Sequence, residues 1–384
     1  MDAAWRAEAH RSMWGLSADP RLSELRDTAR RFARDVVMPA LAAGAADSPG
    51  WTPAKAAVLA ALDRALSPDP ETACQPASTL SLALVAAELA VADGGAATCL
   101  LSGYLAHSVV RDFGTPEQQA RYLDRERYPH AALCLTEPPP GAGVDALTLT
   151  GTARLVVPPG ATPMLDVEKR GRLISHMEFA DFVLLAVDSP GGGCLIVAEP
   201  SDQAEGLFDR GQPIRTLGHR LASVTSPAFR LRVPACRILG GYTCDDGRLV
   251  PRVGYRQALE PALRRCHPVV ALMTAGKILA TLESVHAHLL ADLAAAPLIR
   301  AATGYPRGRE RLPLSLVDAW ADAEAAAALA LEAARISDRM DGATARAAPP
   351  ARISDAPPAD VAQALVPAVS RLFSTRFRGR VKTS

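Results

Sequence analysis

The spacing of apolar residues changes twice along this chain of 384 residues, and that change restricts the folds it can adopt. Apolar residues recur at helical spacing in the first third, as in residues 22–36, and form one face of a helix. From about His130 the apolar runs become short or alternating, and Gly, Pro and Asp separate them, as in a compact β domain. Helical spacing returns after about Pro251. The chain is therefore expected to fold in the order helical, β, helical.

These patterns predict where the elements and domains lie. Further helices are expected at 56–66, 80–91, 269–290, 316–340 and 361–377, and strands at 131–135, 147–155, 182–187, 194–198 and 228–233. Two Pro-Pro pairs among small and polar residues favour a mobile loop at 341–360. The expected fold is α+β, mainly α, with an N-terminal helical domain (1–129), a small middle β-barrel or sheet domain (130–245) and a C-terminal helical bundle (246–384).

Composition argues against several classes of function. The 42 Lys and Arg residues balance 41 Asp and Glu residues, so no basic excess would attract nucleic acid. Neither a signal peptide nor a run of about 18 uncharged apolar residues is found, which predicts a cytoplasmic protein without a membrane span. The seven cysteines lack CxxC spacing, which favours reduced thiols. His286 and His288 are two residues apart on an expected helix and face different sides, so no metal site is predicted.

Four segments carry more information than a generic pattern of helices and strands. Residues 107–123 indicate a helix that stops at Gly114 and a second helix that a capping Thr115 begins. Residues 133–145 indicate a strand and a glycine-rich turn that lets a ligand approach bare backbone. Residues 165–186 indicate a pair of strands, and residues 217–241 a second pair that ends in a Val-Pro turn.

Together these segments resemble the acyl-CoA dehydrogenase family, over about residues 22–377. In that family the second segment reads Thr-Glu-Pro-Gly-Ala-Gly-Ser-Asp, and its backbone N–H groups and Thr hydroxyl hold the flavin ring and pyrophosphate of FAD. The third segment supplies an Ile-Thr pair that faces the flavin. The resemblance thus implies the acyl-CoA dehydrogenase fold and an FAD site that includes seven residues of this chain: Leu133, Leu135, Thr136, Gly141, Gly143, Ile174 and Ser175.

An eighth cofactor residue is implied by the family's Arg-x-x-Phe-Gly segment, which reaches the flavin of a neighbouring subunit. Residues 300–304 resemble that segment, with Thr303 in place of the phenylalanine. In this interpretation Arg300 pairs with the pyrophosphate of FAD. The alternative is a solvated arginine on the surface.

The chain departs from the family at several of these positions. Pro139 and Pro140 follow the Thr-Glu-Pro sequence and supply no N–H donors, and Val144 replaces the serine. Leu173 stands where an aromatic residue often precedes the flavin-facing pair, so a stacking contact worth about 1 kcal/mol would be missing. These changes predict an FAD site that this chain only partly forms.

The resemblance also implies a catalytic base that the sequence does not show. Family members remove an α-proton with a glutamate, either in a Glu-Gly-Thr turn near the C-terminus or on the helix that enters the C-terminal bundle. The first is not found after residues 361–377, which predicts a C-terminally shortened member. At the second, Cys266 takes the glutamate position and His267 that of the next arginine. The candidates are His267, although a single histidine on such a helix more often serves packing or partner contact, and Glu260, expected just before the helix.

The function implied by the resemblance is that of an oxidoreductase acting on CH–CH groups. Its reaction would be FAD-linked α,β-dehydrogenation of an acyl-CoA or acyl-carrier-protein thioester, in fatty acid or secondary metabolism. The missing base predicts a dimer or tetramer, a hetero-oligomer in which a homologous partner subunit supplies the base and shares the FAD. Two alternatives stay open: a flavin-free structural relative that binds an acyl carrier, and a flavin-dependent oxygenase or oxidase on the same fold.

Overall fold

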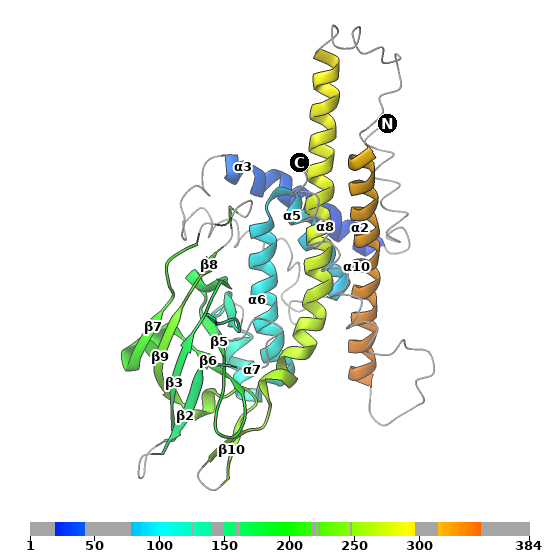
Figure 1. Cartoon of the computed structure of the whole chain (residues 1–384). Coiled ribbons are helices and arrows are strands. Elements are labelled where there is room, and N and C mark those ends of the chain that lie inside the picture. The colour runs from blue at the N-terminus through cyan, green and yellow to red at the C-terminus, as the bar shows by residue number, and fades with distance from the viewer. Residues whose placement is uncertain are drawn as a thin grey trace. The chain divides into compact units, whose positions relative to one another are not determined.

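The computed structural model describes residues 20–42, 78–124, 126–139, 149–157, 162–214, 216, 220–221, 223–245, 248–295 and 314–346. The helices of these segments are α2 (Pro20–Phe32), a π-helical turn (Ala33–Val37), α3 (Met38–Ala42), α5 (Thr79–Ala92), α6 (Gly94–Phe113), α7 (Pro116–Tyr122), α8 (Tyr255–Ala295) and α10 (Leu314–Arg346) (Figure 1). The strands are β1 (Ala131–Cys134), β2 (Thr152–Val156), β3 (Met164–Arg170), β4 (Ile174–Ser175), β5 (Phe182–Val187), β6 (Cys194–Ala198), β7 (Gly206–Asp209), β8 (Val224–Thr225), β9 (Ala228–Pro234), β10 (Tyr242–Asp245) and β11 (Arg248–Pro251).

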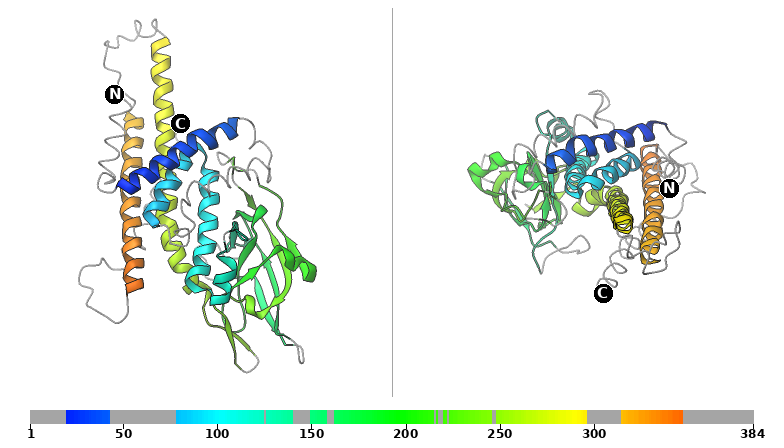
Figure 2. Two further views of the ribbon diagram at one scale, coloured as in Figure 1. Left: turned by 180° about the vertical axis from the view of Figure 1, so that it is seen from behind. Right: turned by 90° about the horizontal axis from the view of Figure 1, so that it is seen from above.

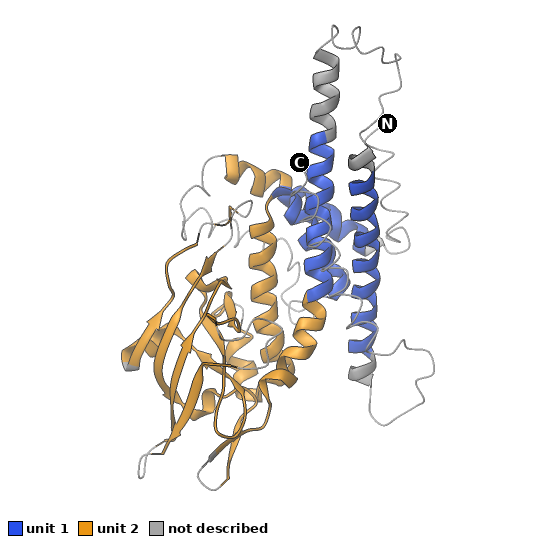
Figure 3. Ribbon diagram, viewed as in Figure 1, with its two compact units in different colours: residues 1–33, 77–92, 267–384 blue, residues 34–76, 93–266 orange. Residues whose placement is uncertain are grey.

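The chain forms two compact units that interleave in the sequence (Figure 3). Unit 1 comprises Met1–Ala33, Ala77–Ala92 and His267–Ser384, and unit 2 comprises Arg34–Pro76 and Asp93–Cys266. Helix α8 therefore contributes residues to both units. The fold is α+β in the predicted order, with helices, then strands, then helices, whereas the predicted domain boundaries stay predictions.

In unit 1, α5 is the central helix, because α2 and α10 both pack against it (Figure 2). It is apolar on nearly every side, and such a helix is stable in water only when it is covered. Asp338 of α10 caps its start, since the carboxylate accepts from the backbone N–H groups of Thr79 at 2.6 Å and Leu80 at 3.1 Å. Glu88 of α5 forms a buried ion pair with Arg26 of α2, at 2.5 Å.

In unit 2, one sheet has the strand order β1-β5-β6 and another the order β2-β3-β9-β7, and two short ribbons pair β4 with β8 and β10 with β11. Every residue of β5 and β6 is buried, because both faces of this sheet are covered. One face, with Leu185 and Ile196, shares a core cluster with Leu165 and Leu231 of the four-stranded sheet. The other face packs on α6, which Figure 2 shows beside the strands.

Several sequence predictions are confirmed in detail. The strands predicted at 182–187 and 194–198 are β5 and β6, and a turn closed by a hydrogen bond from Gly192 to Ser189 joins them. The helix predicted to begin at Thr115 is α7, in which Thr115 and Gln118 form a capping box.

Two predicted boundaries are wrong. Helix α8 begins at Tyr255, before the predicted start at 269. Pro261 removes one backbone hydrogen bond, but the helical turns before and after it keep the backbone helical. Glu260 therefore lies within the helix rather than before it. Helix α10 continues to Arg346, so residues 341–346 are helical rather than part of a loop; the first helix-breaking proline comes only at 349.

The predicted helices at 56–66 and 361–377, and residues 347–360 of the predicted loop, lie outside the described part of the chain. One helix, over Tyr255–Val285, is long and apolar enough to cross a membrane by length and composition alone. The core helix of a soluble protein passes the same test, so the expectation that no helix spans a membrane stays a prediction.

Candidate functional site

The residues predicted to meet a flavin lie mainly on β1 and β4, which contact each other in unit 2. β1 is an edge strand: β5 pairs with it in parallel, from Ala131 with Phe182 to Cys134 with Leu185, and no other described strand continues the ladder on its outer side. An edge strand presents every second N–H and C=O group to whatever lies beside it. β1 can therefore supply backbone hydrogen bonds to a planar ligand.

The end of β1 is joined to the start of β4 by two hydrogen bonds. The backbone N–H of Arg172 donates to the Thr136 carbonyl at 3.0 Å, and the Thr136 hydroxyl donates to the Arg172 carbonyl at 2.5 Å. The hydroxyl oxygen keeps its lone pairs and can still accept a hydrogen bond. Thr136 thus holds the two segments together while remaining able to contact a ligand.

On β4 the side chains alternate in exposure. Ile174 is buried, Ser175 is half-buried, and Leu173 just before them is 54% exposed. Leu173 also has a left-handed backbone, with φ of 55°, a conformation that a leucine rarely adopts. An exposed apolar side chain on a strained backbone is the kind of feature that gathers at ligand sites.

The loop after β1 is anchored by a buried ion pair that the sequence analysis missed. On β3, residues Leu165, Val167 and Lys169 point to the buried side at every second position. The Lys169 ammonium ion lies 2.5 Å from the carboxylate of Glu137, and both side chains are fully buried. Lys169 follows Leu165 and Val167 at every second position, so the alternation of the strand could have predicted that its side chain is buried.

Glu137 also accepts hydrogen bonds from the Thr150 N–H at 2.7 Å, the Thr150 hydroxyl at 2.7 Å and the Gly151 N–H at 2.9 Å. Burial alone would raise the pKa of Glu137, but the hydrogen bonds from Lys169, Thr150 and Gly151 outweigh it and lower the pKa to about 2. Glu137 is therefore an ionised anchor of this loop.

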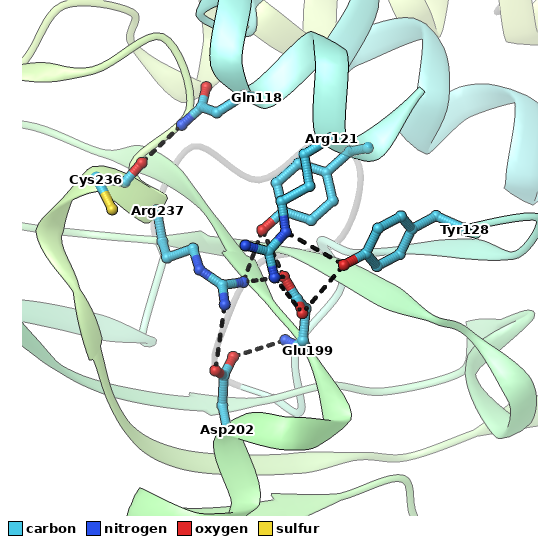
Figure 4. Close-up of polar contacts among 8 residues, drawn as sticks. Gln118, Arg121, Tyr128, Glu199, Asp202, Cys236 and Arg237 are labelled. Atoms are coloured by element: carbon cyan, nitrogen blue, oxygen red, sulfur yellow. Dashed lines mark hydrogen bonds and ion pairs between the residues drawn. The ribbon is translucent and has the colours of Figure 1, made fainter. Parts of the chain in front are cut away.

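A second polar cluster fixes α7 to the end of β6 (Figure 4). The Glu199 carboxylate accepts from the Tyr122 hydroxyl at 2.6 Å and pairs with Arg237 at 2.5 Å and Arg121 at 2.8 Å. Burial by itself would raise the pKa of Glu199, but the Tyr122 hydrogen bond and the two arginines lower it. Asp202 bonds the Glu199 N–H at 2.7 Å. Arg121, Tyr122 and Arg237 are 38 or more residues from Glu199, so no local pattern indicates these contacts.

The structure describes only part of the predicted site. Leu133, Leu135 and Thr136 lie half-buried on or just after β1, next to the β4 pair. The predicted contacts at Gly141, Gly143 and Arg300 lie outside the described residues, as does Val144. The described groups suit a flavin, because its ring edge carries acceptors for backbone N–H and the Ser175 hydroxyl, and an N–H from which the Thr136 oxygen can accept.

The two candidate bases both lie on α8. Glu260 is exposed near the start of the helix, in unit 2, and His267 is half-buried, in unit 1. Burial raises the pKa of the Cys266 thiol to about 12, so this side chain stays protonated near neutral pH and is a poor base. The role of Glu260 or His267 as a base stays a prediction.

Comparison with known proteins gives a consistent result. Residues 19–126 match the N-terminal domain of acyl-CoA dehydrogenases. Glutaryl-CoA dehydrogenase from Mycobacterium smegmatis is 18% identical with a TM-score of 0.60, over 86% of this chain and 80% of that one. An acyl-CoA dehydrogenase complexed with FAD from Bacillus anthracis is 19% identical with a TM-score of 0.63, over 92% of this chain and 55% of that one.

Nitroalkane oxidase from Podospora anserina has a similar fold, at 17% identity and a TM-score of 0.60, over 91% of this chain and 82% of that one. Identities this low show a common fold and leave the reaction open. Residues 19–126 thus match the N-terminal domain of acyl-CoA dehydrogenases, and the chain has the fold of solved acyl-CoA dehydrogenases.

Proposed function

We propose that this chain binds FAD along β1 and β4 and takes part in the α,β-dehydrogenation of an acyl thioester as one subunit of an oligomer. The observation that carries the proposal is that β1 is the edge strand of its sheet among the described strands and contacts β4, with Thr136 joining the two segments. A ligand at this edge would meet backbone donors from one strand and a hydroxyl from the other.

Each described residue has a distinct part in this proposal. The backbone at Leu133 and Leu135 offers N–H groups, Thr136 and Ser175 offer hydroxyls, and buried Ile174 supports the strand from behind. Bound FAD would supply the acceptor for the hydride that leaves the β-carbon of the substrate. The chain's own contribution is to hold the flavin ring and to keep water away from one face.

The base is proposed to come from a homologous partner subunit. Removal of an α-proton needs a carboxylate within hydrogen-bonding reach of the substrate. The family glutamate is replaced by Cys266, whose thiol stays protonated, and Glu260 is exposed on α8. A cytoplasmic location for such an oligomer is likewise part of the proposal, and the balanced charge of the chain is compatible with it.

A second candidate is a flavin-free relative that binds an acyl carrier. It is favoured by Leu173, which exposes an apolar side chain where an aromatic ring would stack on a flavin. An oxidase is a third possibility, since the Podospora anserina nitroalkane oxidase has this fold. Bound flavin separates the second candidate from the first, and oxygen consumption separates the third.

The test is to express the chain alone and together with the product of a neighbouring gene of the same family. The complex is expected to hold FAD and to reduce an artificial electron acceptor with a panel of acyl-CoA thioesters, whereas the single chain is inactive. Thr136→Val is expected to weaken FAD binding about tenfold through the lost hydrogen bonds. Thr243→Val, at an exposed position of β10, is the matched control and should bind FAD as the wild type does. A complex without flavin or dehydrogenation overturns the proposal.

A further inference from the structure

Two histidines flank the strands that carry the proposed FAD contacts. His130 directly precedes β1, and His176 directly follows β4. His176 is 4% exposed; its Nε2 lies 3.4 Å from Nδ1 of His130, and its Nδ1 lies 2.6 Å from the Cys99 carbonyl of α6. Phe179 packs against both rings, with centroids 5.1 Å and 4.3 Å away. The histidines thus join one end of the two strands, as the Thr136 hydrogen bonds join the other.

The backbone at His176 depends on this arrangement. Its φ of 67° is left-handed, which is uncommon for a residue other than glycine, although histidine adopts it more readily than most. The His176 N–H donates to the Ser223 carbonyl at 2.7 Å, so the residue is held on its backbone as well as on its ring. Ser175, the last residue of β4, directly precedes His176. The position of the His176 ring therefore affects the position of β4.

The hydrogen bonds also determine where the protons lie. A carbonyl oxygen only accepts, so Nδ1 of His176 carries a hydrogen that points to Cys99. In the neutral ring Nε2 of His176 is then an acceptor, and Nδ1 of His130 donates to it. The hydrogen bonds therefore select the tautomer of each neutral ring.

The pair can take up one more proton without losing its contact. The proton goes to Nε2 of His176, while His130 moves its hydrogen to the other ring nitrogen and accepts through Nδ1. A second added proton would put two N–H groups face to face and break the contact. The hydrogen bond between the two rings can therefore exist in two protonation states of the pair, neutral and singly charged.

The groups around the pair come from several elements. Asp181 accepts from the His130 N–H at 2.9 Å, and Glu178 has a buried Oε2 without a hydrogen-bond partner in the described part of the chain. Arg210 donates to the Met177 carbonyl at 2.8 Å, and burial lowers the pKa of its guanidinium. Asp181 thus contacts the backbone of His130, and Arg210 contacts the backbone of the residue after His176.

Helix α6 contributes two further titratable groups. The Cys99 thiol donates to the Leu221 carbonyl at 3.6 Å. Both ring nitrogens of His107 face carbonyl oxygens, those of Gly103 at 2.8 Å and Tyr128 at 3.0 Å.

We propose that His130 and His176 form a positioning pair that clamps β1 against β4 and can take up one proton beside Ser175, one of the proposed FAD contacts. The inference rests on the proposed FAD site. A positive charge on the pair, beside Ser175, favours reduction of the flavin because reduction adds negative charge. The reduction potential of the bound flavin is then expected to change its slope with pH where the pair takes up its proton.

The pair itself is tested without any flavin, by NMR of protein labelled with ¹⁵N in its histidine rings. The expected result is the Nδ1–H tautomer for His176 when it is neutral, and a His176 titration midpoint that shifts by more than half a pH unit in His130→Gln. An Nε2–H tautomer, or an unchanged midpoint, overturns the proposal.

The effect on flavin is tested on the flavin-loaded complex. In the wild type the potential should show a change of slope with pH that His130→Gln lacks. His176→Asn keeps a residue that tolerates the left-handed backbone but should weaken FAD binding about tenfold. Phe179→Leu retains both imidazoles and should keep the pH dependence, which separates packing from proton uptake.

The NMR experiment and the redox measurement also distinguish failure of this inference from failure of the proposed function. A complex without flavin refutes the FAD site, and the NMR experiment then decides alone whether the pair exists. A flavin-loaded complex in which wild type and His130→Gln have the same pH profile refutes the positioning role while the proposed function stands.

Discussion

Glu137 connects the loop after β1 to the interior of unit 2. Its carboxylate and the Lys169 ammonium ion are both fully buried, and two ions can stay in such a place only if they pair and their remaining atoms are hydrogen-bonded. The hydrogen bonds from Thr150 and Gly151 complete that requirement. The glutamate of the Thr-Glu-Pro sequence is therefore an architectural residue, and it fixes the position of Thr136 next to it.

Replacing Glu137 by glutamine is expected to destabilise unit 2 by about 3–5 kcal/mol, because Lys169 would remain charged without a partner. Adding Lys169→Met should recover most of that loss. Urea denaturation measures both. Glu168→Gln, which affects an exposed pair with Arg230, is the matched control and should cost less than about 1 kcal/mol. Similar losses at Glu137 and Glu168 would contradict the anchoring role.

The same ion pair predicts how stability depends on pH. The folded pKa of Glu137 is about 2, below the ordinary value of about 4.3, because hydrogen bonds from Lys169 and Thr150 outweigh its burial. Its stabilisation is therefore complete above about pH 5 and is lost as the pH falls toward 2. Thermal melts should show the difference between wild type and Glu137→Gln narrowing from pH 5 to pH 2.5. A difference that does not change with pH would speak against this assignment.

At the scale of elements, Gln118 ties α7 to the β domain, in addition to the Glu199 cluster. Gln118 completes the capping box with Thr115, and its amide also bonds the Cys236 carbonyl at 2.9 Å, the Ile238 carbonyl at 2.7 Å and the Gly240 N–H at 3.0 Å. All hydrogen-bonding groups of this amide point at backbone. The helix cap and the connection to the loop after β9 thus depend on the same residue.

Gln118→Ala is accordingly expected to lower stability more than Thr115→Ala. The loss of the threonine cap alone should cost about 1 kcal/mol, whereas loss of Gln118 leaves several buried backbone groups without partners, at about 1–3 kcal/mol each. Urea denaturation of the two variants side by side provides the measurement. Equal effects would mean that Gln118 acts only as a cap.

Elements that are determined by a few neighbouring residues could be predicted from the sequence, whereas contacts between distant residues could not. β5, β6 and the start of α7 were predicted at the right residues, because continuous apolar runs and a capping box act over a few positions. The start of α8 was missed because proline normally signals a helix start. The pairs Glu137–Lys169, Glu199–Arg237 and His176–Cys99 join residues that are 32 or more positions apart, so only the folded chain brings them together.

At the scale of the whole molecule, the proposed FAD site and the proposed base positions fall in different parts of the sequence. β1 and β4 both belong to unit 2, whereas Cys266, which the resemblance aligns with the family's glutamate, is the last residue of unit 2 and His267 is the first residue of the next segment of unit 1. The proposed oligomer, in which a related subunit supplies the base, is consistent with this arrangement. The family resemblance predicted the two strands by residue, because their sequences are local; it did not predict the Glu137, Glu199 or histidine contacts.

The central claim is that FAD binds along β1 and β4. The visible absorption spectrum of the purified protein tests it most directly. Prepared with its related partner, the protein is expected to show the flavin bands, and Thr136→Val should lose about nine-tenths of the bound FAD at limiting cofactor through the missing hydrogen bonds. A spectrum without flavin bands, after addition of FAD to the chain and to its complex, would contradict the account.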